Sequence, residues 1–295
     1  MLENVQKNKR QSYFIISLFI IVITLIIYYI CVALDLGPFS IIIAMAFSII
    51  SAWSSYYYSD KIVLSLNNAR PATKEENLKL VNILDSLVVA AGLSSTPRLY
   101  VVEDAQANAF ATGRNPENAV ICVTTGLLEK LEYYELEGVL AHELAHVKNY
   151  DILLSTIVTV MVGFVVMISD MFSRNLFYGR RHRRNNNNNN NASAIFMIVG
   201  LIFVILSPIF GKLMQLAISR KREFLADATA VEFTRNPDGL ISALEKISAD
   251  PNELKVANKS TAHMYISNPF REKTSSLWST HPSTEDRVNA LRNIK

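Results

Sequence analysis

Four long uncharged runs of hydrophobic residues alternate with mixed segments along this chain. They are residues 13–34, 39–53, 152–169 and 192–211. A run of about 20 apolar residues is long enough to cross a lipid bilayer as one helix. The pattern therefore predicts about four transmembrane helices in two pairs. The first pair forms an N-terminal anchor in residues 1–58, and the second forms a hydrophobic hairpin in residues 152–211.

The residues around the first pair of runs indicate its orientation. Lys7, Lys9 and Arg10 precede the first run against a single acidic residue, Glu3, and the positive-inside rule places such a segment in the cytoplasm. The first run is long for a signal peptide and no small-residue cleavage site follows it, so we expect an uncleaved anchor. Three tyrosines end the second run like an interfacial aromatic belt, and this run returns the chain to the cytoplasm.

The segment between the third and fourth runs, residues 174–191, opposes the positive-inside rule. It holds five arginines and then seven consecutive asparagines. Low-complexity asparagine cannot bury a core, so we expect disorder here and no ligand role for His182. If both runs span the bilayer, these arginines lie outside the cell, against the rule. We favour spanning; the alternative is a hairpin that only enters the bilayer or packs on the soluble part. In either case its two ends meet on one side.

The remaining segments, residues 59–151 and 212–295, have the mixed composition of one folded unit made in two parts. Thr73 and Glu76 form a capping box before an amphipathic helix over residues 77–91. Three short runs between turn signals predict strands: residues 97–102, 107–113 and 119–124. We therefore expect a mainly α-helical fold with a small antiparallel β-sheet.

Composition supports the membrane assignment and excludes some functions. The chain has 295 residues, of which 50% are hydrophobic and 19% charged, with a mean hydropathy of +0.21. This is too apolar for an ordinary soluble protein of this size. The net charge of +3 gives no argument for nucleic acid, and we expect none as a partner. Cys31 and Cys122 are isolated in sequence, so no disulfide framework or cysteine zinc site is expected.

Residues 141–146 carry the main chemical signal and read Ala-His-Glu-Leu-Ala-His. On a helix, His142 and His146 are four apart and share a face, where two imidazoles can hold one zinc ion. Glu143 lies about 100° round the helix from His142, close enough to act as a general base on a metal-bound water. The pattern is short, and a helix with two partly exposed histidines and a solvated glutamate is the alternative.

A second segment, residues 219–230, can supply the third protein ligand that a two-histidine zinc site lacks. Glu223 and Asp227 again lie four apart on one helical face, and their apolar neighbours indicate that this helix packs. A carboxylate is the third protein ligand in one large class of zinc peptidases, so we predict that role for Glu223. Asp227, one turn on, is predicted to hydrogen-bond the second nitrogen of a liganding imidazole.

The strand before the zinc motif has a possible use in substrate binding. An exposed edge strand can hold an extended peptide through main-chain hydrogen bonds, whatever the peptide's sequence. The candidate substrate strand comprises Asn108, Ala109, Phe110, Ala111 and Thr112. An interior strand that only packs fits the sequence equally well.

In this combination the chain resembles the M48 family of membrane metallopeptidases. The features that carry the resemblance occur in the family's order: Asn108–Gly113, the motif from His142 to His146, the segment from Ser219 to Asp227, and Thr280-His281-Pro282. The resemblance implies a gluzincin-type domain with one zinc ion per subunit. Its ligands would be His142, His146 and Glu223, and Glu143 would be the general base. The family also suggests His281 and Arg287 as donors to the oxyanion; a His-Pro helix start with Arg287 on a solvated face is the alternative.

The resemblance also implies a cellular role. It indicates a multi-pass protein of a bacterial plasma membrane, with a cytoplasmic-facing active site that degrades damaged or misfolded membrane proteins in a stress response. A specialised M48 peptidase acting on one defined motif, and a non-catalytic membrane scaffold or holdase, are the other functions considered; a scaffold would not need Glu143. His263 has no partner pattern, and we expect a loop residue without a role.

Overall fold

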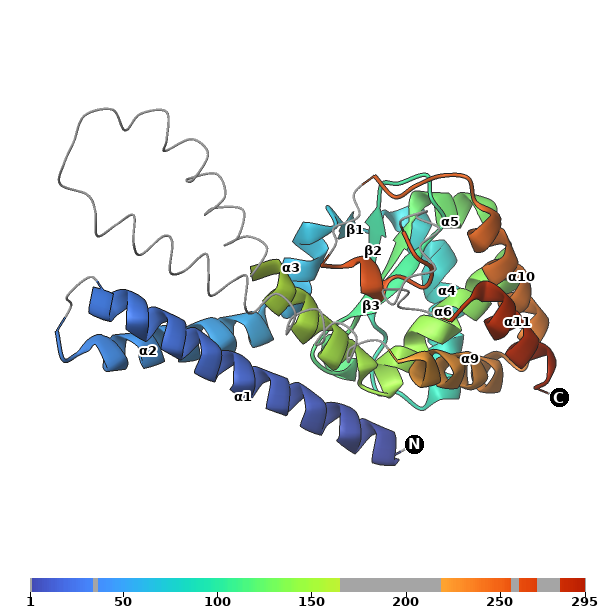
Figure 1. The fold of residues 1–295 in the computed structure, drawn as a ribbon. Helices are drawn as coiled ribbons and strands as arrows, with labels where there is room; N and C mark the ends of the chain where they lie inside the picture. The colour runs from blue at the N-terminus through green and yellow to red at the C-terminus, as the bar shows by residue number, and fades with distance from the viewer. Residues whose placement is uncertain (1, 34–36, 165–218, 256–259, 270–281, 295) are drawn as a thin grey trace.

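The computed structural model describes residues 2–33, 37–164, 219–255, 260–269 and 282–294. Two long helices, α1 (Leu2–Ala33) and α2 (Ser40–Tyr57), extend away from a body of shorter elements (Figure 1). Val5–Tyr29 and Ser40–Tyr57 are long and apolar enough to cross a membrane. Many of their large apolar side chains are exposed, as lipid-facing positions require.

The predicted hydrophobic hairpin is described only in part. Its first helix, Asp151–Phe164, belongs to the described residues and packs its apolar side chains against those of α1. The fourth run, the arginine and asparagine segment and His182 lie outside the described residues. The described residues thus contain two candidate spans, or three if α6 and Asp151–Phe164 form one broken span, and the total of four remains a prediction.

The body contains a four-stranded sheet in the order β1-β2-β4-β3. Its strands are β1 (Arg70–Pro71), β2 (Arg98–Val102), β3 (Ala109–Thr112) and β4 (Val120–Thr124). β1 pairs with β2 and β3 pairs with β4 in antiparallel fashion, but β2 and β4 are parallel. The prediction of an antiparallel sheet is therefore wrong, and the sheet is mixed. After β2 the chain forms β3 at the edge of the sheet and then returns, so that β4 lies between β2 and β3. The spacing of the strands along the sequence does not predict this order.

The helices packed on this sheet and on one another include the ones that the sequence predicts. They are α3 (Ser59–Leu66), α4 (Lys74–Ala91), α5 (Thr125–Lys130), α6 (Tyr133–Lys148), α9 (Arg220–Thr234), α10 (Pro237–Ala249) and α11 (Thr284–Arg292), with short 3-10 turns at Pro116–Asn118 and Ala262–Met264. The capping box of α4 is present: the Thr73 side chain accepts from the Glu76 N–H, and the Glu76 carboxylate accepts from the Thr73 N–H. Both reciprocal bonds satisfy otherwise orphaned amides at the helix start.

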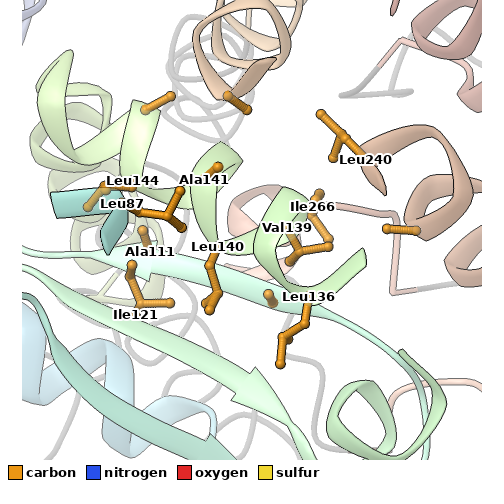
Figure 2. Close-up of a cluster of buried hydrophobic side chains, with 14 of the residues drawn as sticks. Leu87, Ala111, Ile121, Leu136, Val139, Leu140, Ala141, Leu144, Leu240 and Ile266 are labelled. Atoms are coloured by element: carbon orange, nitrogen blue, oxygen red, sulfur yellow. The ribbon is translucent and has the colours of Figure 1, made fainter. Parts of the chain in front are cut away.

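Helix α6 lies at the centre of the main hydrophobic core. Figure 2 shows it between the sheet and α10, and the cluster also includes side chains from α4 and from the segment after the 3-10 turn Ala262–Met264: Leu87, Ala111, Ile121, Leu136, Val139, Leu140, Ala141, Leu144, Leu240 and Ile266. Burying one leucine side chain fully stabilises a fold by about 1.5–3 kcal/mol. The helix that carries the zinc motif is thus held by apolar contacts on several sides.

A glycine contact lets α10 approach α6 closely. A Cβ atom on Gly138 would lie 2.8 Å from the main-chain nitrogen of Leu240. A Cβ atom on Gly239 would in turn lie 2.5 Å from the carbonyl oxygen of Tyr134. The two glycines therefore set the separation of the two helices.

The chain turns sharply after α6. The helix Asp151–Phe164 leaves at 83° to α6, and Tyr150 at the corner has a φ of 60°. Residues other than glycine rarely adopt this conformation, so the surrounding contacts must hold it. The corner places Asp151 back beside the histidines of α6.

Candidate metal centre

Three predicted metal ligands meet between α6 and α9. The Nε2 atoms of His142 and His146 are 3.2 Å apart. The carboxylate oxygens of Glu223 lie 3.7 Å from Nε2 of His142 and 3.6 Å from Nε2 of His146. Tetrahedral zinc with bonds of about 2.0–2.1 Å separates its ligand atoms by roughly 3.3 Å. The arrangement therefore fits one zinc ion held by two imidazoles and a carboxylate.

Asp227 orients the first of these imidazoles. Its Oδ1 atom lies 2.9 Å from Nδ1 of His142, at the nitrogen that faces away from Glu223. A carboxylate at Nδ1 favours the tautomer with its proton there, which leaves Nε2 as the ligand atom. Burial lowers the pKa of His142, and the Arg287 guanidinium lowers it further. His142 is thus kept neutral, the form that binds metal.

Arg287 lies inside the site and not on a solvated face. It is 2% exposed. Its Nε and Nη2 atoms donate to the two carboxylate oxygens of Asp227 at 2.8 and 2.6 Å, and Nη1 donates to the carbonyl oxygen of Ile266 at 3.0 Å. Burial by itself would raise the pKa of Asp227, but Arg287 and His142 hold it well below its usual range. The forked contact fixes the carboxylate that orients His142.

Asp151 plays the corresponding part for the second imidazole and was not predicted. Its Oδ2 atom lies 3.0 Å from Nδ1 of His146. Burial lowers the pKa of His146, but the hydrogen bond to Asp151 and the charge of Glu223 raise it to about 9. A metal ion must therefore displace a proton from His146. The only sequence signal for Asp151 is an acidic residue directly after the zinc helix.

Glu143 is buried beside the predicted ligands. Burial raises its pKa, which reaches about 7, and the nearby Glu223 carboxylate contributes in the same direction; His146 and Arg287 act against this rise. The main chain of Ala111 on β3 hydrogen-bonds the carboxylate. A carboxyl group with a pKa near neutrality can both accept and return a proton at physiological pH.

A cleft of about 470 Å³ opens over these groups and is lined by His142, Glu143, His146, Glu223, Ala111 and His263, among others. His263, expected to be a loop residue without a role, is one of the buried residues of this lining. It is 4% exposed within the turn Ala262–Met264, and its Nε2 atom lies 3.4 Å from Oγ1 of Thr159. The lack of a sequence pattern around it concealed this burial, which comes from tertiary contacts.

The outer edge of β3, the candidate substrate strand, is partly occupied. Tyr265 forms an antiparallel bridge with Phe110, and the Ile266 N–H donates to the carbonyl oxygen of Ala109 at 2.9 Å. Further along, the Asn108 side chain donates to the Ser267 carbonyl oxygen at 3.0 Å, and the hydroxyls of Thr112 and Thr156 are 2.9 Å apart. Ala111 is the residue of this strand that lines the cleft. His281 lies outside the described residues.

Comparisons with known proteins agree with this geometry. The model of peptidase family M48 matches residues 74–295. A protein named Protease HtpX homolog from Dictyoglomus thermophilum is 43% identical over 290 residues, which cover 98% of this chain and 93% of the relative. Its namesake from Lactobacillus acidophilus is 42% identical over 297 residues, 99% of each chain. The crystal structure of S. mikatae Ste24p is a weaker likeness, 19% identical with a TM-score of 0.48, covering 99% of this chain and 67% of that one.

The family match covers well over half of the chain, and the curated relatives align along nearly all of it. The resemblance carried by the sequence motifs is thereby confirmed. This chain belongs to peptidase family M48.

Proposed function

We propose that this protein is a membrane-bound zinc endopeptidase of the gluzincin type. The observation that carries the proposal is the meeting of His142, His146 and Glu223 around one point, with the buried Glu143 beside them in an open cleft. Three protein ligands leave a fourth position open for water or substrate, which is the arrangement of catalytic rather than structural zinc sites.

A bound zinc ion would lower the pKa of water and polarise a peptide carbonyl. Glu143 accepts the proton of the attacking water and later delivers it to the leaving amine. Its raised pKa suits both steps. Asp227 and Asp151 hold the two imidazoles so that their Nε2 atoms would face a bound metal ion, and Arg287 holds Asp227. The N–H of Ala111 is used by the Glu143 carboxylate, but its carbonyl oxygen, at the edge of β3 that lines the cleft, can accept a main-chain hydrogen bond from an extended substrate.

The position of the centre supports polypeptides close to the bilayer as substrates. The helix that follows α6 packs on α1, a candidate membrane span, so the cleft lies near the end of that span. The basic residues that precede the first run favour a cytoplasmic location for this end. We therefore propose a multi-pass protein of a bacterial plasma membrane with four spans. Its cytoplasmic-facing site would degrade damaged or misfolded membrane proteins under stress.

The decisive experiment compares Glu143→Gln with the unaltered full-length protein in detergent. Glutamine keeps the size and polarity of the side chain but cannot accept the proton, so we expect full zinc content with loss of cleavage of an unfolded model polypeptide. Glu223→Ala is the matched control and should lose zinc and activity together. Cleavage that persists in purified Glu143→Gln would remove Glu143 from the mechanism. Absence of zinc-dependent, chelator-sensitive cleavage in the unaltered protein would instead favour a scaffold or holdase.

A further inference from the structure

Asn8, near the N-terminal end of α1, is buried against the metal centre. Its side chain is 4% exposed. The Nδ2 group donates to Oδ1 of Asp151 at 2.6 Å and to the carbonyl oxygen of Asn149 at 3.0 Å. Both amide hydrogens are therefore used on the corner that follows α6. Figure 1 shows that this end of α1 is the one nearer the body of the protein.

These bonds connect the membrane helix to a metal ligand. Oδ1 of Asp151 accepts from Asn8, while Oδ2 of the same carboxylate lies 3.0 Å from Nδ1 of His146. With one oxygen held on each side, the carboxylate cannot rotate about its Cβ–Cγ bond without breaking a short hydrogen bond. The orientation of His146 is thus tied to the position of α1.

Among the described residues, Arg222 also lies close to Oδ1 of Asp151. Its Nε atom lies 3.8 Å from that oxygen, and its Nη2 atom lies 3.4 Å from Oε1 of Gln11 on α1. The contact from Asn8 is more than 1 Å shorter. A 2.6 Å bond lies within hydrogen-bond range, whereas 3.8 Å allows only an ion-pair interaction. Of these two side chains, Asn8 makes the hydrogen bond that holds Oδ1, while His146 holds Oδ2.

Two further contacts keep α1 in place at this corner. The Lys9 Nζ atom lies 4.0 Å from the centre of the Tyr150 ring, a cation–π distance. Along the same helix, Ile15 and Phe19 belong to one apolar cluster with the helix Asp151–Phe164. These contacts hold the positive φ of Tyr150, and with it the direction of the Asp151 side chain.

We infer that Asn8 is a positioning residue of the metal centre, which makes the first membrane helix a working part of the zinc site. The inference rests on the proposed role of His146 as a ligand. Replacing Asn8 should change the affinity for zinc, because Asn8 acts through Asp151 on the orientation of the His146 ring. Loss of such an outer partner typically weakens metal affinity about 10–100-fold.

The test measures zinc affinity of the full-length protein in detergent by competition with a chromophoric chelator. Asn8→Ala should weaken zinc binding about tenfold. Asn8→Asp keeps the shape of the side chain but places an acceptor against the Asp151 carboxylate, and it should weaken binding at least as much. Ser12→Ala is the matched control. Ser12 is buried on the same helix and its hydroxyl donates only to the Asn8 carbonyl oxygen, at 2.9 Å, so its removal should leave zinc affinity unchanged.

A double-mutant cycle separates positioning from general loosening of the fold. If Asn8 acts through Asp151, Asn8→Ala should add no loss to that of Asp151→Ala, whereas independent effects would add. Unchanged zinc affinity in Asn8→Ala and Asn8→Asp, full additivity with Asp151→Ala, or an equal loss in Ser12→Ala would overturn the inference. His146→Ala tests the underlying proposal separately: if it binds zinc as tightly as the unaltered protein, His146 is not a ligand.

Discussion

Replacing Arg287 by methionine distinguishes two roles for this residue, which are to position Asp227 and to donate a hydrogen bond to the oxyanion. Methionine is similar in length and apolar, so it fills most of the buried space. It removes both hydrogen bonds to Asp227 and the one to the Ile266 carbonyl oxygen. Asp227 would then keep His142 as a close partner, at 2.9 Å.

The expected cost follows from burial. Arg287 and Asp227 are 2% and 1% exposed, and breaking such a pair by removing one partner costs about 3–5 kcal/mol. At roughly 2–4 °C per kcal/mol for a domain of this size, the thermal midpoint should fall by about 10 °C. The uncompensated carboxylate should also draw a proton onto His142, so zinc affinity should fall as well, about 10–100-fold.

Thermal unfolding and chelator competition on the full-length protein measure both quantities. Arg292→Met is the control on the same helix. Its side chain is 61% exposed and pairs with Glu245 at the surface, so its removal should change the midpoint little. An oxyanion donor would behave differently from a positioning residue. Its loss would lower kcat by about 10²–10³-fold, with stability and zinc affinity unchanged. That second pattern in Arg287→Met would refute the positioning role assigned to this residue.

Two further predictions concern the zinc helix. Gly138→Ala would place a Cβ atom 2.8 Å from the main chain of α10 and should lower stability by about 1–3 kcal/mol through overpacking. Gly163→Ala is the control and should be tolerated, because its Cβ would meet its nearest neighbour at 3.7 Å. Equal thermal unfolding midpoints for the two variants would contradict this reasoning. The pH profile of kcat/KM should rise with pH on its acid side, because Glu143 must lose its proton to act as a base. Its pKa is about 7 and a bound cation lowers it, so the midpoint should lie at or below neutrality, and a decline with rising pH in this range would exclude Glu143 as the base.

Local geometry explains which parts of the site the sequence could predict. His142 and His146, like Glu223 and Asp227, are four residues apart, so helix geometry alone places each pair on one face. Strands β2, β3 and β4 and the capped helix α4 could be located for a similar reason, since turn signals and capping depend on neighbouring residues. The two-residue strand β1 was not predicted, because it exists only through its pairing with β2.

The missing parts all depend on contacts between distant segments. Asp151 faces His146 only because the chain turns by 83° at Tyr150. His263 reaches the cleft from a 3-10 turn. Asn8 reaches Asp151 from the basic segment before the first hydrophobic run, where the sequence predicts only a cytoplasmic flank of the anchor. The parallel pairing of β2 and β4 likewise depends on the path of the chain between them, which places β3 beyond β4 at the edge of the sheet. No periodic pattern records such choices.

The separation of the ligands along the chain has a consequence during synthesis. His142 and His146 leave the ribosome well before Glu223, and Arg287 follows later still. A growing chain that has made only α6 holds two imidazoles and a base but no third ligand. Because domains fold as the chain emerges from its N-terminus, cleavage activity must wait until α9 and α11 have been made and have packed on α6. Under the proposed function, a newly made molecule cannot cut neighbouring polypeptides before α9 and α11 have packed on α6.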